Sequence, residues 1–513
     1  MSSLGDLAGP VQDWTQRFVD DDVARRLADR DATLWTDDPT VHALIANRLG
    51  WVGMSGAEVG PGLAAGDVLL LGMGGSSLGA EAVATAFDLD RLRVVDSTIP
   101  EAVRDSAARL DQVSDIVVAS KSGGTLETAA LARFFESEAP AGTRFHAVTD
   151  PGSDLERRAS ERGYAMTHTN PADIGGRFSV LSAFGAVPLS LAGIDVASVR
   201  REAAVAVEEC GTDGEHNPGI WLGAVLAAAA ATGRTNMVLV PAPGLEGLAD
   251  WIEQLVAEST GKGGIGILPV VAPREMPLDR WRDDAFVVDL AWRDGEEHAA
   301  LQDAGDVPVV RCALASPAEI GREFYVWQVA TALVGRTLGI NPFDEPNVAA
   351  AKQQTREILD QGEVGVLAEG NPQRWRVVDG DVADLRRLAT SDGGSYVGVL
   401  AYLAPRAATR RAIVRLRTAL WEGLPVTVGW GPRYLHSSGQ FHKGGRVGGR
   451  FLVVTQTQED LPVPGMAWTF GTIARAQALG DASALRAAGR DVVHLHVECG
   501  LDQVVDEILA SLE

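Results

Sequence analysis

Cysteine and positive charge are scarce in this chain of 513 residues. Only three cysteines occur, Cys210, Cys312 and Cys499. They are odd in number and widely spaced, which argues against a disulfide framework and favours a reducing compartment. The net charge is −24 and no basic stripe runs along the sequence. Because phosphate backbones are bound by basic faces, this charge argues against a nucleic-acid partner.

Long hydrophobic runs are also missing. The longest, Ile220 to Ala231, is shorter than the roughly 20 residues that a membrane span needs. It is expected to form a buried helix. The first residues, MSSLGDLAGPVQDW, contain no basic segment followed by an apolar one, so we expect no secretion signal. Together with the cysteine pattern, these absences predict a cytoplasmic protein without a membrane partner.

Lysine is the rarest of the common charged residues, with four copies against 41 arginines. A lysine kept in such a sequence can mark a place where a compact ammonium is needed and a planar guanidinium does not serve. The four are Lys121, Lys262, Lys352 and Lys443, and all lie in segments with other chemical signals. Lys262 and Lys443 could also be lysines by chance, without a functional role.

What the chain does contain is a regular alternation of apolar runs and helical segments. The first 60 residues have helical spacing. From Asp67 onward, three series of short apolar runs alternate with helices, which is typical of parallel sheets covered on both faces. We therefore predict an α/β fold. The expected strands include DVLLLG, RLRVV, SDIVVA and RFHAVT, then NMVLVP, GILPVV, AFVVDLAW and PVVRCAL, then SYVGVLAYL, PVTVGW, RFLVVTQ and VVHLHVE.

The segment LGMGGSSLGAE, residues 71–81, follows the first predicted strand. Its glycines, Gly75 among them, allow a tight turn that exposes backbone N–H groups at the start of a helix, an arrangement that binds anions. Ser76 and Ser77 add hydroxyls. A dinucleotide site is the rival interpretation, with Asp96 placed for a ribose, but the pattern G-x-G-x-x-G fails at Ser77.

A second loop, SKSGGTLET, follows the strand SDIVVA. Ser120, Ser122 and Thr125 bring hydroxyls to paired glycines, and Lys121 adds a compact cation. One Ser or Thr could be an ordinary helix cap, but a cap explains only one hydroxyl. No P-loop pattern is present, which argues against nucleotide hydrolysis. The loop predicts a pocket for a phosphomonoester.

The two loops together resemble the paired signature of sugar isomerase domains, in particular of the glucose-6-phosphate isomerase family. Further segments agree: Gly175-Gly176-Arg177-Phe178-Ser179, Gln254-x-x-x-Glu258-Ser259-x-Gly261-Lys262, Asn341-Pro342-Phe343-Asp344-x-Pro346-x-Val348 with Lys352, and His436-Ser437-x-Gly439-Gln440. The match covers about residues 67 to 443. It is most similar to the isomerase half of fused transaldolase–glucose-6-phosphate isomerase proteins, although this sequence contains no transaldolase part.

The resemblance implies an enzyme that interconverts glucose 6-phosphate and fructose 6-phosphate through an enediolate, in glycolysis and gluconeogenesis, without a cofactor or metal. It implies sugar isomerase domains in tandem, with helices on both faces of their sheets, and a homodimer. We expect a helical segment over 1–60, a phosphate-binding domain over 61–205, a second domain over 206–375, and a C-terminal α/β unit over 376–513.

Moving a carbonyl between C1 and C2 needs a base that takes a proton from one carbon and returns it to the other, and a carboxylate in a water-poor site suits this task. Glu258 is the candidate, with Gln254 one turn earlier on the same helix face. A fixed cation should face the developing oxyanion, for which Arg177 is the candidate. Without the family pattern, Glu258 would be interpreted as a surface glutamate and Arg177 as a structural ion-pair partner.

By resemblance, His436 and Lys352 open the sugar ring, and Ser76, Ser120, Ser122 and Thr125 hold the phosphate. The sequence departs from better-known members in two ways. The histidine motif follows the lysine motif, and Glu345 replaces a glutamine seven residues before Lys352.

Other histidines and other functions are weaker candidates. His494 and His496 share a strand face near Cys499, but a metal site needs more ligands. His442 and Lys443 could contact substrate or be solvated. A sugar-phosphate sensor without catalysis, and an isomerase that also accepts mannose 6-phosphate or an amino sugar phosphate, are the competing functions.

Overall fold

The computed structural model describes residues 2–54, 56, 62–214, 216–272, 284–295, 301, 305–361, 374–378, 380–390, 393–421 and 424–512. Contacts divide the chain into two compact units. The first comprises Met1–Val94, Asp111–Thr128 and Pro140–Asp344. The second comprises Val95–Leu110, Ala129–Ala139 and Glu345–Glu513.

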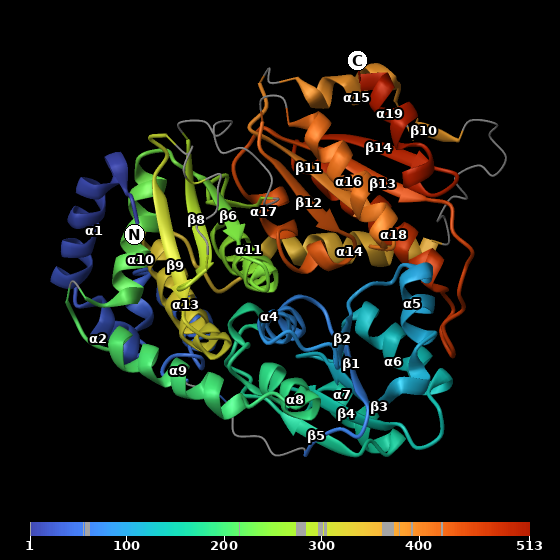
Figure 1. Cartoon of the computed structure of the whole chain (residues 1–513), viewed down its shortest axis with the longest axis horizontal. Helices are drawn as coiled ribbons and strands as arrows, with labels where there is room; N and C mark the ends of the chain where they lie inside the picture. Colours follow the sequence, from blue (N-terminus) through green and yellow to red (C-terminus); the bar gives the residue numbers. More distant parts are fainter. Residues whose placement is uncertain are drawn as a thin grey trace. The chain divides into compact units, whose positions relative to one another are not determined.

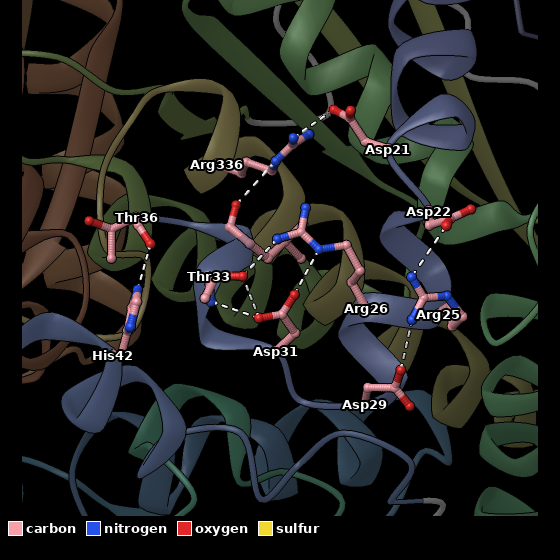
Figure 2. A network of polar contacts seen from close by, with 11 residues as sticks. Asp21, Asp22, Arg25, Arg26, Asp29, Asp31, Thr33, Thr36, His42 and Arg336 are labelled. Carbon is pink, nitrogen blue, oxygen red and sulfur yellow. Dashed lines mark hydrogen bonds and ion pairs between the residues drawn. The ribbon is translucent and has the colours of Figure 1, made fainter. Parts of the chain in front are cut away.

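The first unit begins with helices, as the sequence predicted: α1 (Ala8–Asp20), α2 (Val23–Ala28), the 3₁₀ turn η2 (Ala32–Leu34) and α3 (Pro39–Ala46). Arg336 of α13 (Ile320–Thr337) holds this segment (Figure 2). Its Nη2 donates to Asp21 at 2.6 Å and its Nε donates to the Leu34 carbonyl at 3.1 Å. The N-terminal helices are therefore bonded to a core helix that lies about 300 residues further along the chain.

The first sheet has the strand order β2-β1-β3-β4-β5. Strand β1 pairs in parallel with β3, β3 with β4, and β4 with β5. The strands are β1 (Asp67–Leu71), β2 (Leu92–Val95), β3 (Val113–Ala119), β4 (Arg144–Thr149) and β5 (Met166–Thr169). The connecting helices are α4 (Leu78–Ala86), α5 (Pro100–Ala107), α6 (Leu126–Glu138) and α7 (Asp154–Arg162), and α8 (Ala183–Ala192) follows β5.

The second sheet, also in the first unit, has the order β7-β6-β8-β9 with every pair parallel. Its strands are β6 (Asn236–Pro241), β7 (Leu268–Val271), β8 (Ala285–Trp292) and β9 (Val309–Leu314). Its helices are α9 (Val196–Cys210), α10 (Pro218–Ala231), α11 (Glu246–Thr260) and α13. Helix α10 contains the longest apolar run of the sequence, and it is buried against α13 (Figure 1).

The second unit contains a third sheet in the order β10-β14-β13-β11-β12, parallel except for β10, which runs antiparallel to β14. Its strands are β10 (Trp375–Val378), β11 (Tyr396–Tyr402), β12 (Val426–Trp430), β13 (Gly449–Gln456) and β14 (Asp491–Val497). Its helices include α14 (Pro346–Gln361), α15 (Val382–Ala389), α16 (Ala407–Leu420), α17 (Gly439–Gly444), α18 (Phe470–Ala487) and α19 (Val505–Leu512).

The parallel strands of all three sheets wind in the same way. The first strand of each series, β1, β6 or β11, lies between the second and the third strands. Successive connections therefore leave it in opposite directions, which makes the edge beside its carboxyl end a topological switch point. In doubly wound α/β folds, ligands bind at this switch point. The three switch points here lie between β1 and β3, between β6 and β8, and between β11 and β13.

The predicted α/β class with parallel sheets is confirmed. The four-part division of the chain stays a prediction. Within the described residues, no helix combines the length and the apolar character needed to cross a membrane. Cys210, Cys312 and Cys499 are all free thiols.

Candidate functional site

The first hydroxyl-rich loop lies at the carboxyl end of β1, where the sequence predicted it. A 3₁₀ turn, η3 (Gly74–Ser76), leads into α4, and Gly74 has a positive φ of 53°. Gly75 and Ser76 are partly exposed. A Cβ atom at Gly75 would lie 2.1 Å from the carbonyl oxygen of Gly176, so only glycine permits this approach. The loop thereby contacts the segment that carries Arg177.

The second loop follows the neighbouring strand β3, so the first switch point brings both loops together. Its hydroxyls form a tight turn. Ser120 Oγ accepts a hydrogen bond from the Gly123 N–H at 3.2 Å and lies 3.5 Å from Thr125 Oγ1. Ser122 Oγ accepts from the Gly124 N–H at 3.2 Å. Ser120 is buried, whereas Ser122 is exposed and Thr125 half-buried. Together with the backbone N–H groups at the start of α6, these hydroxyls can bind an anion.

Lys121 has internal partners that the sequence did not reveal. Its ammonium forms an ion pair with Asp150, directly after β4, and donates to the Ala172 carbonyl at 2.7 Å. Burial raises the pKa of the Asp150 carboxyl, although Lys121 acts in the opposite direction. This ion pair ties the second loop to the neighbouring strand end. Phosphate binding by Lys121 stays a prediction.

Arg177 lies in a 3₁₀ turn, η5 (Gly176–Phe178), and is only 3% exposed. Its Nε donates to Ser259 Oγ at 2.8 Å, and its Nη2 donates to the carbonyl oxygens of Pro342 at 2.7 Å and Asp344 at 3.0 Å. These three bonds hold the guanidinium in one orientation. Such a fixed, desolvated cation is suited to stabilise developing negative charge.

Glu258 lies in the last turn of α11 and is 7% exposed. Its Oε1 lies 3.4 Å from Arg177 Nη1, and its Oε2 accepts from Gln254 Nε2 at 3.2 Å. Helix α11 packs on α4 (Figure 1), and Gly247 permits this contact because a Cβ there would lie 2.7 Å from the Cα of Ala82. The predicted glutamate, glutamine and arginine therefore meet in the structure, and the surface-glutamate interpretation is wrong.

Lys262 is a member of this cluster that the sequence left undecided. It is 6% exposed, and its Nζ lies 2.6 Å from Asp344 Oδ1 and 2.5 Å from the Asn341 carbonyl. Burial, followed by the charge of Arg177, lowers the pKa of Lys262 to about 8, although Asp344 pulls it upward. Because Asp344 also binds Arg177 through its carbonyl, Lys262 holds the segment that orients the arginine. The scarcity of lysine was the signal that pointed to it.

Aromatic packing supports the same segment. The Phe343 ring lies 5.4 Å from the Phe178 ring and 4.9 Å from that of Trp35, and Phe178 stacks on Trp51 at 5.0 Å. All four side chains are buried. The residues on either side of Phe343 provide the carbonyl acceptors for Arg177, so this apolar cluster fixes their position.

In the second unit, the structure brings the histidine and lysine motifs together. His436 ends the 3₁₀ turn η8 (Arg433–His436), which follows β12. Gln440 of the same motif accepts from the Asn347 N–H at 2.9 Å and donates to Asn347 Oδ1 at 2.8 Å. Asn347 lies in the first turn of α14, which also carries the exposed Lys352. Two motifs whose bonded residues are 93 positions apart thus share one pair of hydrogen bonds.

His442 and Lys443 are not solvated loop residues, which corrects one of the two interpretations left open by the sequence. His442 is fully buried, lies 3.1 Å from Tyr396 OH through its Nδ1, and has its pKa lowered to about 3 by burial. Lys443 is 6% exposed and its Nζ lies 2.5 Å from Asp481 Oδ1, while Tyr434 OH donates to the other oxygen of Asp481. Both residues belong to the core of the second unit.

The pair His494 and His496 is satisfied by threonines. Thr455 Oγ1 lies 2.8 Å from His494 Nε2 and 2.9 Å from His496 Nδ1, and Thr457 Oγ1 lies 3.0 Å from His496 Nε2. Burial lowers the pKa of His494 to about 4. In the described part of the chain, no group of three or more His, Cys, Asp or Glu side chains is placed to hold a metal ion.

Solved structures with the same fold are known. A hypothetical protein from Thermus thermophilus superposes with a TM-score of 0.56 at 23% identity, covering 70% of this chain and all of that one. A glucose-6-phosphate isomerase from Chlamydia trachomatis superposes with a TM-score of 0.51 at 21% identity, covering 58% of this chain and 70% of that one. The fold is therefore that of the sugar isomerase class.

Curated relatives narrow the class to a family. The chain is 32% identical to the glucose-6-phosphate isomerase of Symbiobacterium thermophilum over 359 residues, 57% of this chain and 80% of that protein. It is 30% identical to a probable glucose-6-phosphate isomerase of Natronomonas pharaonis, over 58% of this chain and 79% of that protein. No family model matches the chain. The chain belongs to the glucose-6-phosphate isomerase family, and the finer resemblance to transaldolase fusions stays a prediction.

Proposed function

We propose that the protein interconverts glucose 6-phosphate and fructose 6-phosphate by proton transfer between C1 and C2. The observation that carries this proposal is the buried contact of Arg177 Nη1 with Glu258 Oε1 at 3.4 Å, next to two hydroxyl-rich loops. A carboxylate and a guanidinium side by side provide the base and the oxyanion partner that the reaction needs. Membership in the isomerase family supports the same assignment.

In this mechanism, Glu258 removes the proton from C2 of the aldose and returns it to C1. The negative charge that develops on the enediolate oxygens faces Arg177, whose other donors are already engaged with Ser259 and two backbone carbonyls. Since the guanidinium does not have to reorient during the reaction, its stabilising effect is available in the transition state. Gln254 orients the Glu258 carboxylate through the hydrogen bond at 3.2 Å.

The two loops at the first switch point anchor the phosphate. Backbone N–H groups at the starts of α4 and α6, including that of Gly75, and the loop hydroxyls are the donors. The side chains assigned to this task are Ser76, Ser120, Lys121, Ser122 and Thr125. Because phosphate binding and proton transfer use different groups, loss of one function leaves the other measurable.

Ring opening of the cyclic sugar is assigned to His436 and Lys352. Both come from the second unit, in motifs joined by Gln440 and Asn347. Catalysis depends on where side chains meet rather than on their order in the chain, so the late position of the histidine motif does not exclude this role. We also propose that the enzyme is a homodimer and acts in the cytoplasm.

The test combines one substitution with a set of substrates. Glu258→Gln should lower kcat with glucose 6-phosphate by about 10²–10⁴-fold, since the amide cannot accept the proton, while KM changes little. Glu246→Gln, at the exposed start of the same helix, is the matched control and should keep wild-type turnover.

The wild-type enzyme is assayed beside these variants with glucose, mannose and glucosamine 6-phosphates. Near-normal turnover by Glu258→Gln would remove Glu258 from the mechanism. Absence of turnover by the wild type, with sugar phosphate still bound, would favour the alternative function of a sensor. A rate with mannose 6-phosphate comparable to that with glucose 6-phosphate would show that the enzyme accepts both sugars.

A further inference from the structure

A cavity of about 310 Å³ opens in the second unit, at the carboxyl ends of three strands. Tyr402 is the last residue of β11, Gln456 is the last residue of β13, and His496 lies near the end of β14. All three line the cavity, together with Gln458 and with Arg475 of α18. None of the lining residues belongs to the catalytic or phosphate-binding set proposed for the isomerase reaction.

The position of this cavity is the one that sheet topology favours for a ligand. The third sheet places β11 between β12 and β13, so its switch point lies between β11 and β13. That is where Tyr402 and Gln456 meet the cavity. The first sheet has the same winding, and its switch point carries the two hydroxyl-rich loops. Ligands of open α/β sheets bind in this crevice because loops and helix N-termini converge there.

Two side chains that line the cavity carry polar atoms without a partner among the described residues. Across that part of the chain, Arg475 forms no ion pair or hydrogen bond, and its Nε is buried and unsatisfied. Gln458 Oε1 is likewise buried and unsatisfied. A buried polar group left without a partner is destabilising, so two of them on one cavity indicate a site for a polar ligand.

Among the described residues that line the cavity, one side chain is basic, Arg475, and one is acidic, Asp460. Asp460 lies on the cavity wall. Its carboxylate accepts hydrogen bonds at the start of α18, from the Gly471 N–H at 2.9 Å and from Thr469 Oγ1 at 2.7 Å. Glu101, which accepts from Gln456 Nε2 at 3.3 Å, lies 3.6 Å from the guanidinium of Arg406. Among the described residues of this wall, Arg475 therefore remains a cation without an acidic partner.

The remaining wall offers neutral hydrogen-bonding groups. Thr457 Oγ1 donates to Glu498 at 2.8 Å, so it accepts from His496 Nε2 at 3.0 Å, and His496 Nδ1 in turn accepts from Thr455 Oγ1. Burial lowers the pKa of His496, in keeping with a neutral ring. Hydroxyl and amide groups held in this way are suited to bind ligand hydroxyls.

We propose that this cavity is a second ligand site, which binds a small hydroxylated organic anion through Arg475 and Gln458. Its volume lies at the lower end of the roughly 300–1,000 Å³ typical of small-molecule sites, so the ligand has the size of a sugar phosphate or sugar acid rather than of a dinucleotide. A sugar phosphate and a sugar acid would both offer a negative charge to Arg475 and hydroxyl groups to the rest of the wall. The experiment below distinguishes these two kinds of ligand.

Isothermal titration calorimetry on the full-length protein is the test, with sorbitol 6-phosphate, gluconate and uncharged sorbitol as probes. Wild-type protein should bind one of the anions at a site that Arg475→Met weakens at least tenfold, and should not bind sorbitol. Because the catalytic site also binds phosphates, sorbitol 6-phosphate should bind with two equivalents per chain if the phosphate source is right. Gluconate binding that depends on Arg475 would assign the site to carboxylates.

Arg486→Met is the matched control, since Arg486 lies exposed on the same helix. It should leave binding unchanged, and both variants should keep wild-type turnover with glucose 6-phosphate, which shows that they fold. Gln458→Leu provides an independent variant and should weaken the same binding event. Failure of both anions to bind outside the catalytic site, or binding that is equal in wild type and Arg475→Met, would overturn the proposal and leave the proposed isomerase activity untouched.

Discussion

Lysine residues illustrate how much chemistry depends on single positions. Lys262 and Lys443 are each 6% exposed, and each forms an ion pair with an aspartate, Asp344 or Asp481. A buried ammonium is tolerated only where acceptors surround it, and its compact charge fits where a planar guanidinium does not. The chain has 41 arginines, so lysine at these two positions needs an explanation. The structure provides it in the buried ion pairs, which the sequence alone did not reveal.

The pKa of Lys262 leads to a prediction about pH dependence. Below about pH 8 its ammonium is charged and holds Asp344, and through this segment it holds the carbonyls that orient Arg177. As the pH rises through about 8, the charge is lost and the contact weakens. We expect kcat/KM to fall on the alkaline side with an apparent pKa near 8. In Lys262→Met, turnover should be about tenfold lower and this alkaline fall should disappear.

The measurement is a pH–rate profile between about pH 7 and pH 9.5 for wild type, Lys262→Met and Lys262→Arg. The arginine variant keeps a charge throughout this range, so any activity it retains should not fall near pH 8. An alkaline fall at the same pH in all three proteins would assign the titration to another group.

At the scale of elements, close approaches between loops and helices shape the site. The first loop contacts the Arg177 turn through Gly75, where a Cβ would lie 2.1 Å from a backbone carbonyl. Because the obstacle is backbone rather than a flexible side chain, a larger residue forces one of the two segments to move. Gly176 lies in the same contact but differs in its surroundings, since a Cβ there would meet no atom within 4 Å.

These two glycines give a matched pair of substitutions. Gly75→Ala should lower kcat/KM at least tenfold and the melting temperature by several degrees, because it separates the phosphate loop from Arg177. Gly176→Ala should change the free energy of unfolding by no more than about 0.5 kcal/mol. Thermal unfolding and steady-state kinetics on both variants check this. Equal effects of the two substitutions would mean that the contact at Gly75 is not what positions the loop.

Most helices and strands could be predicted from the periodicity of the sequence. Three could not, and in each case there is a physical reason why the local pattern is missing. The strand β5 (Met166–Thr169) is largely exposed and has no apolar run. The strand β10 (Trp375–Val378) is half-buried and short, and it is defined by antiparallel pairing with β14. Helix α18 contains small residues on most faces and is buried over much of its length, so no clear amphipathic stripe marks it. In each case, tertiary pairing rather than local pattern specifies the element.

For the molecule as a whole, the described side chains predict that catalysis does not depend on a metal. His494 and His496 are the histidines that most resemble a pair of metal ligands, and both rings form hydrogen bonds with Thr455 Oγ1. Dialysis against EDTA should therefore leave kcat within about twofold of its starting value. Loss of turnover that zinc restores would contradict the prediction and would require ligands beyond the described residues.

The sequence by itself determined the α/β class through local periodicity and the two hydroxyl-rich loops through residue types at fixed spacing, whereas Glu258 and Arg177 were singled out by the resemblance to the isomerase family. Only the tertiary structure decided the partners of the buried charges. Lys121 pairs with Asp150, 29 residues away, and Lys262 with Asp344, 82 residues away. Strand order also became known only in three dimensions, and with it the cavity beside Arg475. The physical reason is that desolvated ion pairs and switch points arise from segments that fold together, and spacing along the chain does not encode which segments meet.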